Sequence, residues 1–271
     1  MRHVLVTGGS SGIGLAVAAL LLARGDRVSL IARDEGRLSK AQDALSQAGT
    51  LEQRVMAVPA DVTDAQALTE AVARCTSRFG AIDMLVACAG IVEPARFVDQ
   101  DEADFDRQIA VNVTGVTNSL RSVLPAMLKR GRGRIGIVSS GAGLIGIPGY
   151  SAYCTSKFAL RGLAAALRLE TARSGVSVSI CFPPDTLTPQ LEREVALRPP
   201  DAQAIMGRVR PLDARTVASI ILAGVEKNRR EIHFGLILRL LGYFGPFAST
   251  YIEMRHGQRY AIKVGDPPRT P

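Results

Sequence analysis

The stretch Thr7-Gly8-Gly9-Ser10-Ser11-Gly12-Ile13-Gly14 decides the fold class of this 271-residue chain. The β-branched run before it, at 3–7, predicts a strand, and the apolar pattern after it, from Ile13 to Arg24, predicts a helix. Glycines at such a junction permit a tight turn, close packing of helix on strand and close approach of a pyrophosphate. The free N–H groups of the helix N-terminus then face the phosphates. The turn therefore predicts a dinucleotide site.

Strands and helices alternate through most of the remaining chain. Further strand patterns occur at 27–32, 54–59, 83–88, 133–139 and 176–182, and helical patterns lie between them at about 35–48, 64–79, 101–130 and 151–174. Six strands in this order predict an α/β fold: a single domain over residues 1–271 with a doubly wound, Rossmann-type parallel sheet and helices on both faces. The stretch 101–130 is expected to hold two helices in succession.

Two segments depart from this alternation. The segment 184–213 contains five prolines between helical fragments, and a long irregular insertion beside a binding crevice is expected to act as a substrate lid. A helix is expected at about 213–227. The extension 233–271 opens with an apolar stretch, 233–247, that contains and adjoins several arginines, which suits peripheral contact with an anionic membrane. The alternative is that this stretch closes the substrate pocket or a subunit interface.

Composition excludes several classes of protein. A hydrophobic fraction of 47% with 21% charged residues excludes a disordered chain, and the absence of tryptophan predicts an aliphatic core. No apolar run reaches the length of a membrane-spanning helix, and the chain enters a strand without room for a signal peptide. The four cysteines lack the spacing of a disulfide framework or a metal site. We therefore expect a cytoplasmic protein without a bound metal.

The charge balance favours anionic partners. There are 33 Lys and Arg residues against 25 Asp and Glu residues, a formal net charge of +8. No run of five or six basic residues occurs, so nucleic acid is not an expected partner. Cofactor phosphates account for only a little of this charge, which leaves room for contact with a membrane surface.

The end of the second strand bears on the choice of cofactor. The family resemblance described below implies that Ala32 stands where NAD-binding members carry an acid. The guanidinium of Arg33 suits a 2′-phosphate, and Arg37 lies one helical turn away. Asp34 is the counter-evidence, because an acid about 20 residues beyond the glycine motif can bind ribose. The other alternative is that Arg33 is a solvated surface charge. We expect NADPH as the cofactor.

A second set of residues has the types and spacing of a catalytic site. Ser140, Tyr153 and Lys157 are separated by 13 and 4 residues, and Asn112 lies 28 residues before Ser140. Positions 153 and 157 share one helix face, and Ser140 follows the fifth strand, at the sheet edge where ligands bind. A ketone that accepts a hydride needs a proton donor. A lysine cation at about 4 Å lowers a tyrosine pKa by about three units, so Lys157 is expected to poise Tyr153 near neutrality.

The glycine turn and these four residues together resemble the short-chain dehydrogenase/reductase family, over about residues 3–226. The resemblance implies that Tyr153 is the general acid/base and that Ser140 hydrogen-bonds the substrate oxygen. It implies that Lys157 also binds the nicotinamide ribose and that Asn112 holds a water linking Lys157 to solvent. The implied cofactor contacts are Gly8, Ser10, Ser11, Gly12, Ile13, Gly14, Arg33, Arg37, Asp61, Val62, Ala89, Gly90, Tyr153, Lys157, Pro183, Thr186 and Thr188. Asp61 is equally suited to cap the next helix.

Three strings are similar to one branch of that family, the 3-ketodihydrosphingosine reductases. They are Ile82-Asp83-Met84-Leu85-Val86, Ser156-Lys157-Phe158-Ala159-Leu160-Arg161-Gly162-Leu163-Ala164 and Pro183-Pro184-Asp185-Thr186-Leu187-Thr188-Pro189. By this match Thr186 and Thr188 contact the nicotinamide amide and the phosphates. The alternative is a rigid strand exit with turn residues. Ala87-Cys88-Ala89-Gly90 departs from the Asn-Asn-Ala-Gly of the family, whose lost asparagine usually steadies the sheet beside the adenosine.

The resemblance implies NADPH-dependent reduction of a lipid-like ketone by a homo-oligomer, namely of 3-ketodihydrosphingosine to dihydrosphingosine in sphingolipid synthesis. One alternative is a reductase or dehydrogenase of another apolar ketone or alcohol, such as a steroid, a retinoid or a fatty-acyl compound. Another is a non-catalytic dinucleotide sensor on the same fold. Sensors of that kind commonly lose the tyrosine or the lysine. Both Tyr153 and Lys157 are present, which favours an enzyme.

Overall fold

The computed structural model describes residues 1–46, 52–206 and 210–260. Within these residues the central sheet has seven strands in the order β3-β2-β1-β4-β5-β6-β9, and all neighbouring pairs are parallel. The strands are β1 (His3–Thr7), β2 (Arg27–Ala32), β3 (Val55–Pro59), β4 (Met84–Ala87), β5 (Gly133–Val138), β6 (Val176–Phe182) and β9 (Glu231–His233). The order reverses between β1 and β4, and ligands of doubly wound sheets bind at the carboxyl ends of the strands beside such a reversal.

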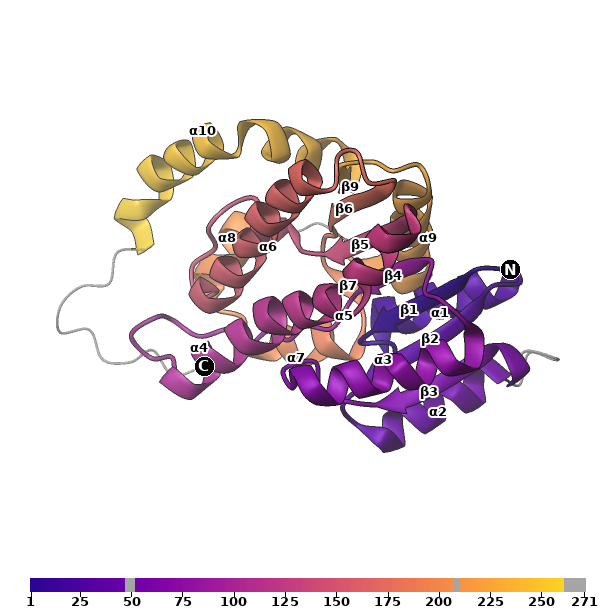
Figure 1. Ribbon diagram of the computed structural model, residues 1–271. Helices are drawn as coiled ribbons and strands as arrows, with labels where there is room; N and C mark the ends of the chain where they lie inside the picture. Colours follow the sequence, from indigo (N-terminus) through magenta and orange to yellow (C-terminus); the bar gives the residue numbers. More distant parts are fainter. Residues whose placement is uncertain (47–51, 207–209, 261–271) are drawn as a thin grey trace.

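Helices cover both faces of the sheet (Figure 1). They are α1 (Gly12–Ala23), α2 (Glu35–Ser46), α3 (Ala65–Phe79), α4 (Glu102–Ile109), α5 (Gly115–Arg130), α6 (Ser151–Glu170), α7 (Pro189–Leu197), α8 (Pro200–Met206), α9 (Ala214–Glu226) and α10 (Gly235–Tyr260). Side chains of α1, α2 and α9 form one core with the sheet, and side chains of α3, α5 and α6 form the other. The predicted α/β architecture is confirmed.

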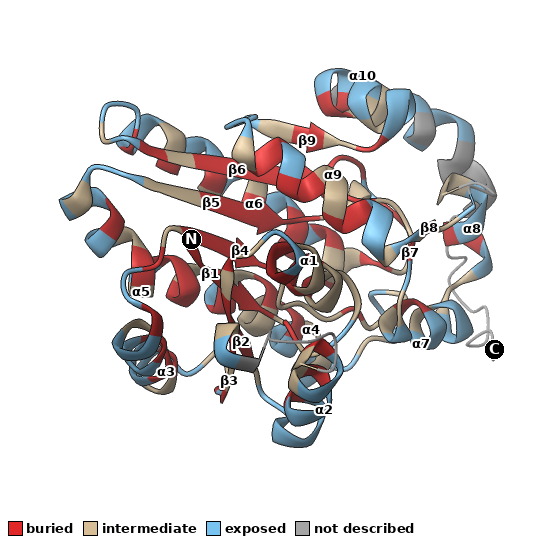
Figure 2. Cartoon of the chain, turned by 90° about the vertical axis from the view of Figure 1, so that its right-hand side faces the viewer, coloured by how far each residue is buried: buried red, intermediate tan, exposed pale blue. Residues whose placement is uncertain are grey.

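Burial follows from this three-layer arrangement. Figure 2 shows buried residues concentrated along the strands and exposed residues on the outer faces of the helices. Every residue of β1 and β4 is buried, because strands covered on both faces need continuous apolar runs rather than alternation. The core is aliphatic, as expected, with Phe182 the largest of its fully buried side chains.

One detail of the prediction is wrong. The sheet has a seventh strand, β9, which pairs with β6 through Ile180 and Glu231. It has only three residues, two of them charged or polar, so it carries no strand pattern. The stretch 101–130 holds two helices in succession, as expected; these are α4 and α5, and a π-helical turn, η2 (Ala110–Thr114), joins them. Asn112 lies in that turn, and π-turns inside helices are frequent at functional sites.

The segment 184–213 is more regular than expected. It contains α7, α8 and the short strands β7 (Thr186–Leu187) and β8 (Leu212–Asp213), which pair with each other. Residues 207–209 lie outside the described residues. Thr188 caps α7, because its hydroxyl accepts a hydrogen bond from the Leu191 N–H at 3.2 Å. The segment starts at the end of β6, so it crosses the carboxyl edge of the sheet.

The predicted extension 233–271 begins with β9 and continues as the long helix α10, while 261–271 lie outside the described residues. Arg161 of α6 holds this helix, since its Nη2 donates to the Gly242 carbonyl at 2.7 Å. The helix lies at the periphery of the molecule in both ribbon views (Figures 1 and 2). Among the described residues, no helix combines the length and the apolar character needed to cross a bilayer.

Candidate active site

The glycine turn lies between β1 and α1 at the point where the strand order reverses. Gly8 and Gly12 have φ values of +69° and +53°, which side chains with a Cβ rarely adopt. A Cβ at Gly8 would lie 2.8 Å from the backbone of Ala89, and one at Gly14 would overlap the Gly8 carbonyl oxygen. The turn is therefore shaped by its lack of side chains, as predicted.

The first turn of α1 is open to a ligand. Ser11 occupies the N-cap position in an extended conformation, and its side chain makes no capping hydrogen bond. Ser11 is exposed, and Ser10 and Ile13 are partly exposed. The N–H groups and the positive end of the helix dipole suit an anion there. Thr188 adjoins this turn, because a Cβ at Gly12 would lie 2.9 Å from its methyl group.

The end of β2 presents a cation beside the turn. The Arg33 side chain is 72% exposed, and its Nη1 lies 3.8 Å from Oδ2 of Asp61. Asp34 is already engaged: its Oδ1 accepts from the Arg37 N–H at 2.8 Å and its Oδ2 lies 3.4 Å from Arg37 Nε. Asp34 therefore stabilises the start of α2. Arg33 is more exposed and has a longer ion-pair contact, so its guanidinium is more available to a ligand than the Asp34 carboxylate.

Asp61 and Val62 follow β3 at the same edge. Asp61 accepts from both the N–H and the hydroxyl of Thr63, at 2.9 and 2.8 Å. The capping alternative for Asp61 is wrong, because Asp64 caps α3 through the N–H groups of Gln66 and Ala67. The Val62 side chain packs against Gly115 of α5.

Tyr153 and Ser140 meet at the carboxyl edge. Ser140 follows β5 and caps a short 3-10 turn, η3 (Gly141–Gly143), where its Oγ accepts from the Ala142 N–H at 3.2 Å. Tyr153 lies in the first turn of α6. Burial raises the pKa of Tyr153 above its ordinary value, the negative charge of Glu194 adds to this, and a hydrogen bond with the Ser140 side chain acts against it.

Lys157 lies one helical turn after Tyr153 and is buried. Its Nζ donates to the Val138 carbonyl at 3.2 Å and lies 5.4 Å from the centre of the Tyr153 ring. Burial lowers the pKa of Lys157 to about 8. The expectation that Lys157 draws the Tyr153 pKa down toward neutrality is wrong for this structure, because desolvation of the hydroxyl outweighs the other influences on it.

Asn112 is fully buried, and its side chain makes three hydrogen bonds. Its Oδ1 accepts from the Ile91 N–H at 2.8 Å, and its Nδ2 donates to the Ile91 carbonyl and to Ser156 Oγ, each at 2.9 Å. A Cβ at Gly90 would lie 3.2 Å from Asn112 Oδ1 and 3.3 Å from Lys157 Nζ, so these two side chains flank Gly90. Asn112 therefore ties the loop after β4 to α6.

Two further predicted contacts lie after β6. The Pro183 carbonyl accepts from the Gly141 N–H at 3.0 Å, which joins the strand exit to the turn beside Ser140. Thr186 is buried, and its hydroxyl donates to the Pro184 carbonyl at 2.9 Å. The proline-rich exit thus has a structural function, and it brings both threonines, Thr186 and Thr188, to the edge that carries the glycine turn.

The cysteines of the site carry no activated thiol. Cys88 belongs to the string Ala87-Cys88-Ala89-Gly90, which differs from the Asn-Asn-Ala-Gly of the family. Burial raises the pKa of Cys88 to about 12 and that of Cys154 to about 11. All four cysteines, Cys75, Cys88, Cys154 and Cys181, are free. The described residues contain no group of three or more His, Cys, Asp or Glu side chains that could hold a metal ion.

A cluster that the sequence analysis missed borders Tyr153. We call it the Arg198 cluster; its members are Tyr150, Asp185, Glu194 and Arg198. Arg198 lies 2.9 Å from Oδ2 of Asp185 and 2.7 Å from Oε1 of Glu194. The i, i+4 spacing of Glu194 and Arg198 in the lid segment was the available signal, because such pairs meet on one helix face.

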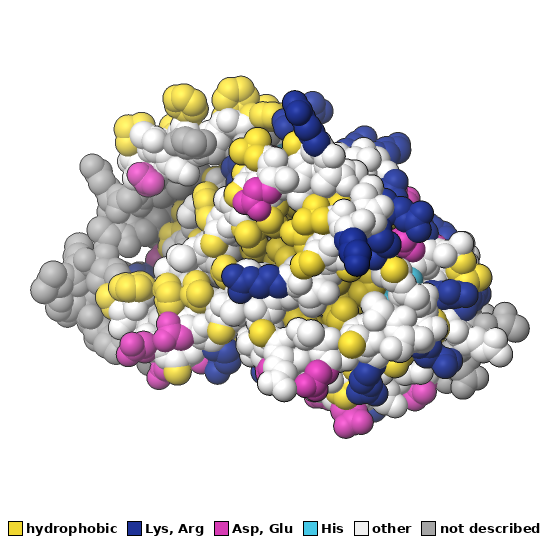
Figure 3. All heavy atoms as spheres, in the orientation of Figure 1, with side chains coloured by type: hydrophobic (Ala, Val, Ile, Leu, Met, Phe, Trp, Pro, Cys, Tyr) yellow, Lys and Arg dark blue, Asp and Glu magenta, His cyan; other side chains and the backbone are white. Residues whose placement is uncertain are grey.

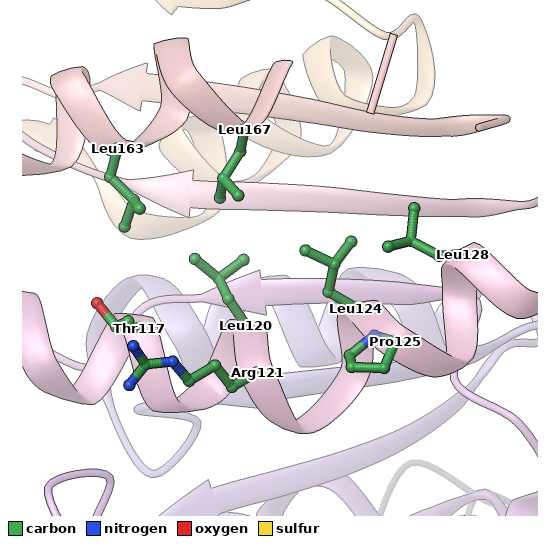
Figure 4. Close-up of a pocket in the computed structure, with 8 residues that line it drawn as sticks. All are labelled: Thr117, Leu120, Arg121, Leu124, Pro125, Leu128, Leu163 and Leu167. Atoms are coloured by element: carbon green, nitrogen blue, oxygen red, sulfur yellow. The ribbon is translucent and has the colours of Figure 1, made fainter. Parts of the chain in front are cut away.

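An apolar groove lies elsewhere, between α5 and α6. It measures about 420 Å³ and is lined by Thr117, Leu120, Arg121, Leu124, Pro125, Leu128, Leu163 and Leu167. Figure 4 shows leucines of both helices pointing into the gap, and Figure 3 shows hydrophobic side chains gathered in the middle of that face. Arg121 is the only charged residue among the described residues that line it, and these residues offer no pair of groups for proton transfer.

The residues at the carboxyl edge fit a nicotinamide dinucleotide. The glycine turn leaves a cradle that a Cβ would fill, and the open first turn of α1 suits a pyrophosphate. Arg33 supplies an exposed cation, and Lys157 supplies a buried one beside Gly90. Tyr153 and Ser140 stand where a carbonyl can accept a proton. The arrangement can therefore support proton transfer next to a bound dinucleotide.

Comparison with known proteins agrees with a dinucleotide-dependent enzyme. The short chain dehydrogenase family matches residues 2–197. A 3-ketodihydrosphingosine reductase of Dictyostelium discoideum is 34% identical over 90% of this chain and 78% of its own length. A 3-dehydrosphinganine reductase of Arabidopsis thaliana is 38% identical over 92% of this chain and 73% of its own length.

A solved structure is also similar. An actinorhodin polyketide ketoreductase variant, crystallised with NADPH, has a TM-score of 0.78 and 27% identity, covering 89% of this chain and 97% of its own. The fold, the matched residues and the reductase names agree on an NAD(P)-dependent oxidoreductase that acts on a carbonyl/hydroxyl pair. The chain therefore belongs to the short chain dehydrogenase family.

Proposed function

We propose that the chain reduces the keto group of 3-ketodihydrosphingosine with NADPH as the hydride donor. The observation that carries the proposal is the meeting of Tyr153, Ser140 and Lys157 at the sheet edge beside the glycine turn. The names of the relatives from Dictyostelium and Arabidopsis support the substrate. The exposed Arg33 and the engaged Asp34 support NADPH over NADH.

In this proposal Tyr153 donates the proton, and Ser140 positions the substrate oxygen that accepts it. The raised pKa keeps the Tyr153 hydroxyl protonated at neutral pH, which is the form that reduction consumes. Ser140 hydrogen-bonds the substrate oxygen and directs it toward Tyr153, and the hydroxyl proton passes to that oxygen as alkoxide charge develops. Asn112 fixes the loop after β4, and with it Gly90, beside Lys157.

The cofactor would be held along the carboxyl edge. The residues assigned to it are Gly8, Ser10, Ser11, Gly12, Ile13, Gly14, Arg33, Arg37, Asp61, Val62, Ala89, Gly90, Tyr153, Lys157, Pro183, Thr186 and Thr188. When bound, NADPH supplies the hydride. Lys157 then acts at the nicotinamide ribose, and Arg33 and Arg37 act at the 2′-phosphate. The segment 184–213 acts as the lid.

The test measures NADPH consumption by the purified protein with 3-ketosphinganine, which is another name for 3-ketodihydrosphingosine. The same assay is run with a panel of apolar ketones that includes a steroid and a retinoid. We expect the highest kcat/KM for the sphingoid ketone. Preference for another apolar ketone would replace the substrate. Tight NADPH binding without turnover of any ketone would favour the sensor alternative.

The pH dependence of reduction should follow Lys157. With a pKa of about 8, Lys157 is charged below pH 8 and neutral above it, while Tyr153 stays protonated throughout this range. Loss of the cation weakens the cofactor contact, so kcat/KM for reduction should be level between pH 6 and 7.5 and fall about tenfold per unit well above pH 8. A profile that is flat to pH 9.5, or that rises with pH, would contradict this.

We further propose that α10 contacts an anionic membrane. Large apolar side chains, which we call the α10 stripe, follow one face of this helix and are each at least 47% exposed; they are Leu236, Ile237, Leu240, Tyr243, Phe244, Phe247, Tyr251 and Met254. Figure 3 shows hydrophobic side chains projecting along the top of the molecule over α10. Arg239 and Arg255 on the same helix add positive charge. Such a face suits the interface of a bilayer, where the substrate resides.

Membrane contact should depend on the α10 stripe. The double variant Ile237→Asp/Phe247→Asp changes two side chains that are 69% and 77% exposed, so folding should survive. Cosedimentation with vesicles of mixed neutral and anionic lipid should fall at least tenfold, since each side chain loses about 1.5–3 kcal/mol of apolar burial. Leu169→Asp, at an equally exposed site on α6, is the control. Equal binding by all three proteins would assign the stripe to a protein interface, such as the expected homo-oligomer.

A further inference from the structure

The Arg198 cluster joins the lid segment to the start of α6. The Tyr150 hydroxyl donates to Glu194 Oε1 at 2.8 Å and accepts from Arg198 Nε at 3.1 Å. Arg198 Nη2 pairs with Glu194, and the third guanidinium nitrogen, Nη1, pairs with Asp185. Pro199 packs on Gly149, immediately before Tyr150. These contacts hold α7 in place beside α6.

The cluster borders the position of the reacting carbonyl. The rings of Tyr150 and Tyr153 meet edge-on with their centres 6.3 Å apart. The charges of Glu194 and Asp185 both act on the Tyr153 hydroxyl and raise its pKa. A carbonyl that is hydrogen-bonded to Tyr153 therefore lies within the electrostatic reach of both carboxylates.

The charges in the cluster do not balance. Among the residues that the structure describes, two carboxylates of the cluster face one guanidinium, which leaves a net charge of −1 when all three are ionised. The Arg198, Glu194 and Asp185 side chains are 7%, 12% and 25% exposed. Lys157, which also lies near Tyr153, donates to the Val138 carbonyl, and in the described part of the chain it forms no ion pair with Asp185 or Glu194. Because an unbalanced charge at such low exposure is costly, a purely structural link would be served better by one carboxylate.

We propose that Glu194, assisted by Asp185, is the specificity determinant that binds an ammonium group on the carbon next to the substrate ketone. This inference rests on the proposed function, since 3-ketodihydrosphingosine is an amino ketone with its nitrogen on that carbon. Both hydrogen bonds of Glu194 to described residues use Oε1, so Oε2 is available to accept from the ammonium. The bound cation brings the cluster to neutrality.

A structural link and an ammonium site make different predictions. If the cluster only holds α7 in place, its loss affects every substrate alike. If Glu194 binds the ammonium, its loss affects amino ketones selectively. Glu194→Gln separates the two roles, because the amide oxygen still accepts from Tyr150 and Arg198 while the charge of the cluster rises from −1 to zero.

The experiment measures kcat/KM for 3-ketosphinganine and for its N-acetyl derivative, which keeps the ketone and the chain but has no charge on nitrogen. The wild-type protein should prefer the free amine, and Glu194→Gln should reduce that preference at least tenfold, as expected for a lost charge-assisted hydrogen bond. Glu192→Gln, an exposed position on the same helix, should leave it unchanged. Equal losses for both substrates, or no loss, would overturn the inference.

Inhibition of the wild-type protein supplies a second readout that needs neither a folded variant nor a sphingoid substrate. Dodecylamine should inhibit reduction of any accepted ketone at least tenfold more strongly than dodecanol, and equal inhibition would overturn the inference. A protein that reduces other ketones but neither sphingoid compound would overturn the proposed function, whereas the comparison of amine with alcohol would still test Glu194.

Discussion

Replacement of Tyr153 by phenylalanine should lower the turnover of every ketone substrate by about 100-fold or more. The change removes one hydroxyl, the group that hydrogen-bonds Ser140 and that we assign to proton transfer. The ring remains, so its contacts with Tyr150 and with the Lys157 ammonium should persist. The measurement is kcat for NADPH-dependent reduction at saturating ketone.

The control for this variant is its own cofactor affinity. Binding of NADPH, followed by fluorescence, should stay within about threefold of the wild-type value, because the ring at position 153 is kept and the glycine turn, Arg33 and Lys157 are untouched. Lys157→Ala should lose both turnover and cofactor affinity, since two roles are assigned to Lys157. Near-normal turnover in Tyr153→Phe would contradict the catalytic assignment.

Charge reversal at Arg33 should weaken NADPH binding by about 10- to 150-fold, the equivalent of roughly 1.5–3 kcal/mol for a lost charge-assisted hydrogen bond. Arg33→Asp places a carboxylate where the 2′-phosphate is expected, next to the existing carboxylate of Asp61. NADH lacks that phosphate, so its affinity should hold or improve. Dissociation constants for both nucleotides, measured by titration, test the prediction.

Arg132→Asp is the matched control for Arg33→Asp. Arg132 is an exposed arginine before β5, at the amino edge of the sheet, whereas Arg33 follows β2 at the carboxyl edge. Both variants change the net charge equally, but only the change at position 33 should alter nucleotide preference. If the wild-type protein already prefers NADH, Asp34 becomes the ribose ligand despite its part in capping α2.

The fold was predictable from the sequence wherever the local pattern of apolar residues and glycines matches the way that the segment packs in the folded chain. Strands such as β1 and β4 are short apolar runs because both faces are covered, and the glycines mark the turn before α1. The strand β9 escaped prediction because its three residues are fixed by pairing with β6, not by their own pattern. The π-turn at Asn112 depends on contacts with Ile91 and Ser156, which lie 21 and 44 residues away.

The candidate site was also predictable in part: the positions of its residues followed from the sequence, and their pKa values did not. The spacing of Ser140, Tyr153 and Lys157 predicted that they would meet, because a strand end and one helix face determine their positions. The electrostatics were not predictable from spacing. The pKa of Tyr153 depends on its burial and on the carboxylate of Glu194, which comes from a helix that the sequence presented only as part of a proline-rich insertion.

The most direct test of the proposed function follows the hydride. The purified protein is given 3-ketosphinganine and NADPH that carries deuterium at both positions of nicotinamide carbon 4, and the sphinganine formed is analysed by mass spectrometry. The account predicts one deuterium per product molecule, located at carbon 3, with one NADPH consumed for each. Absence of sphinganine, or sphinganine without deuterium at carbon 3, would contradict it.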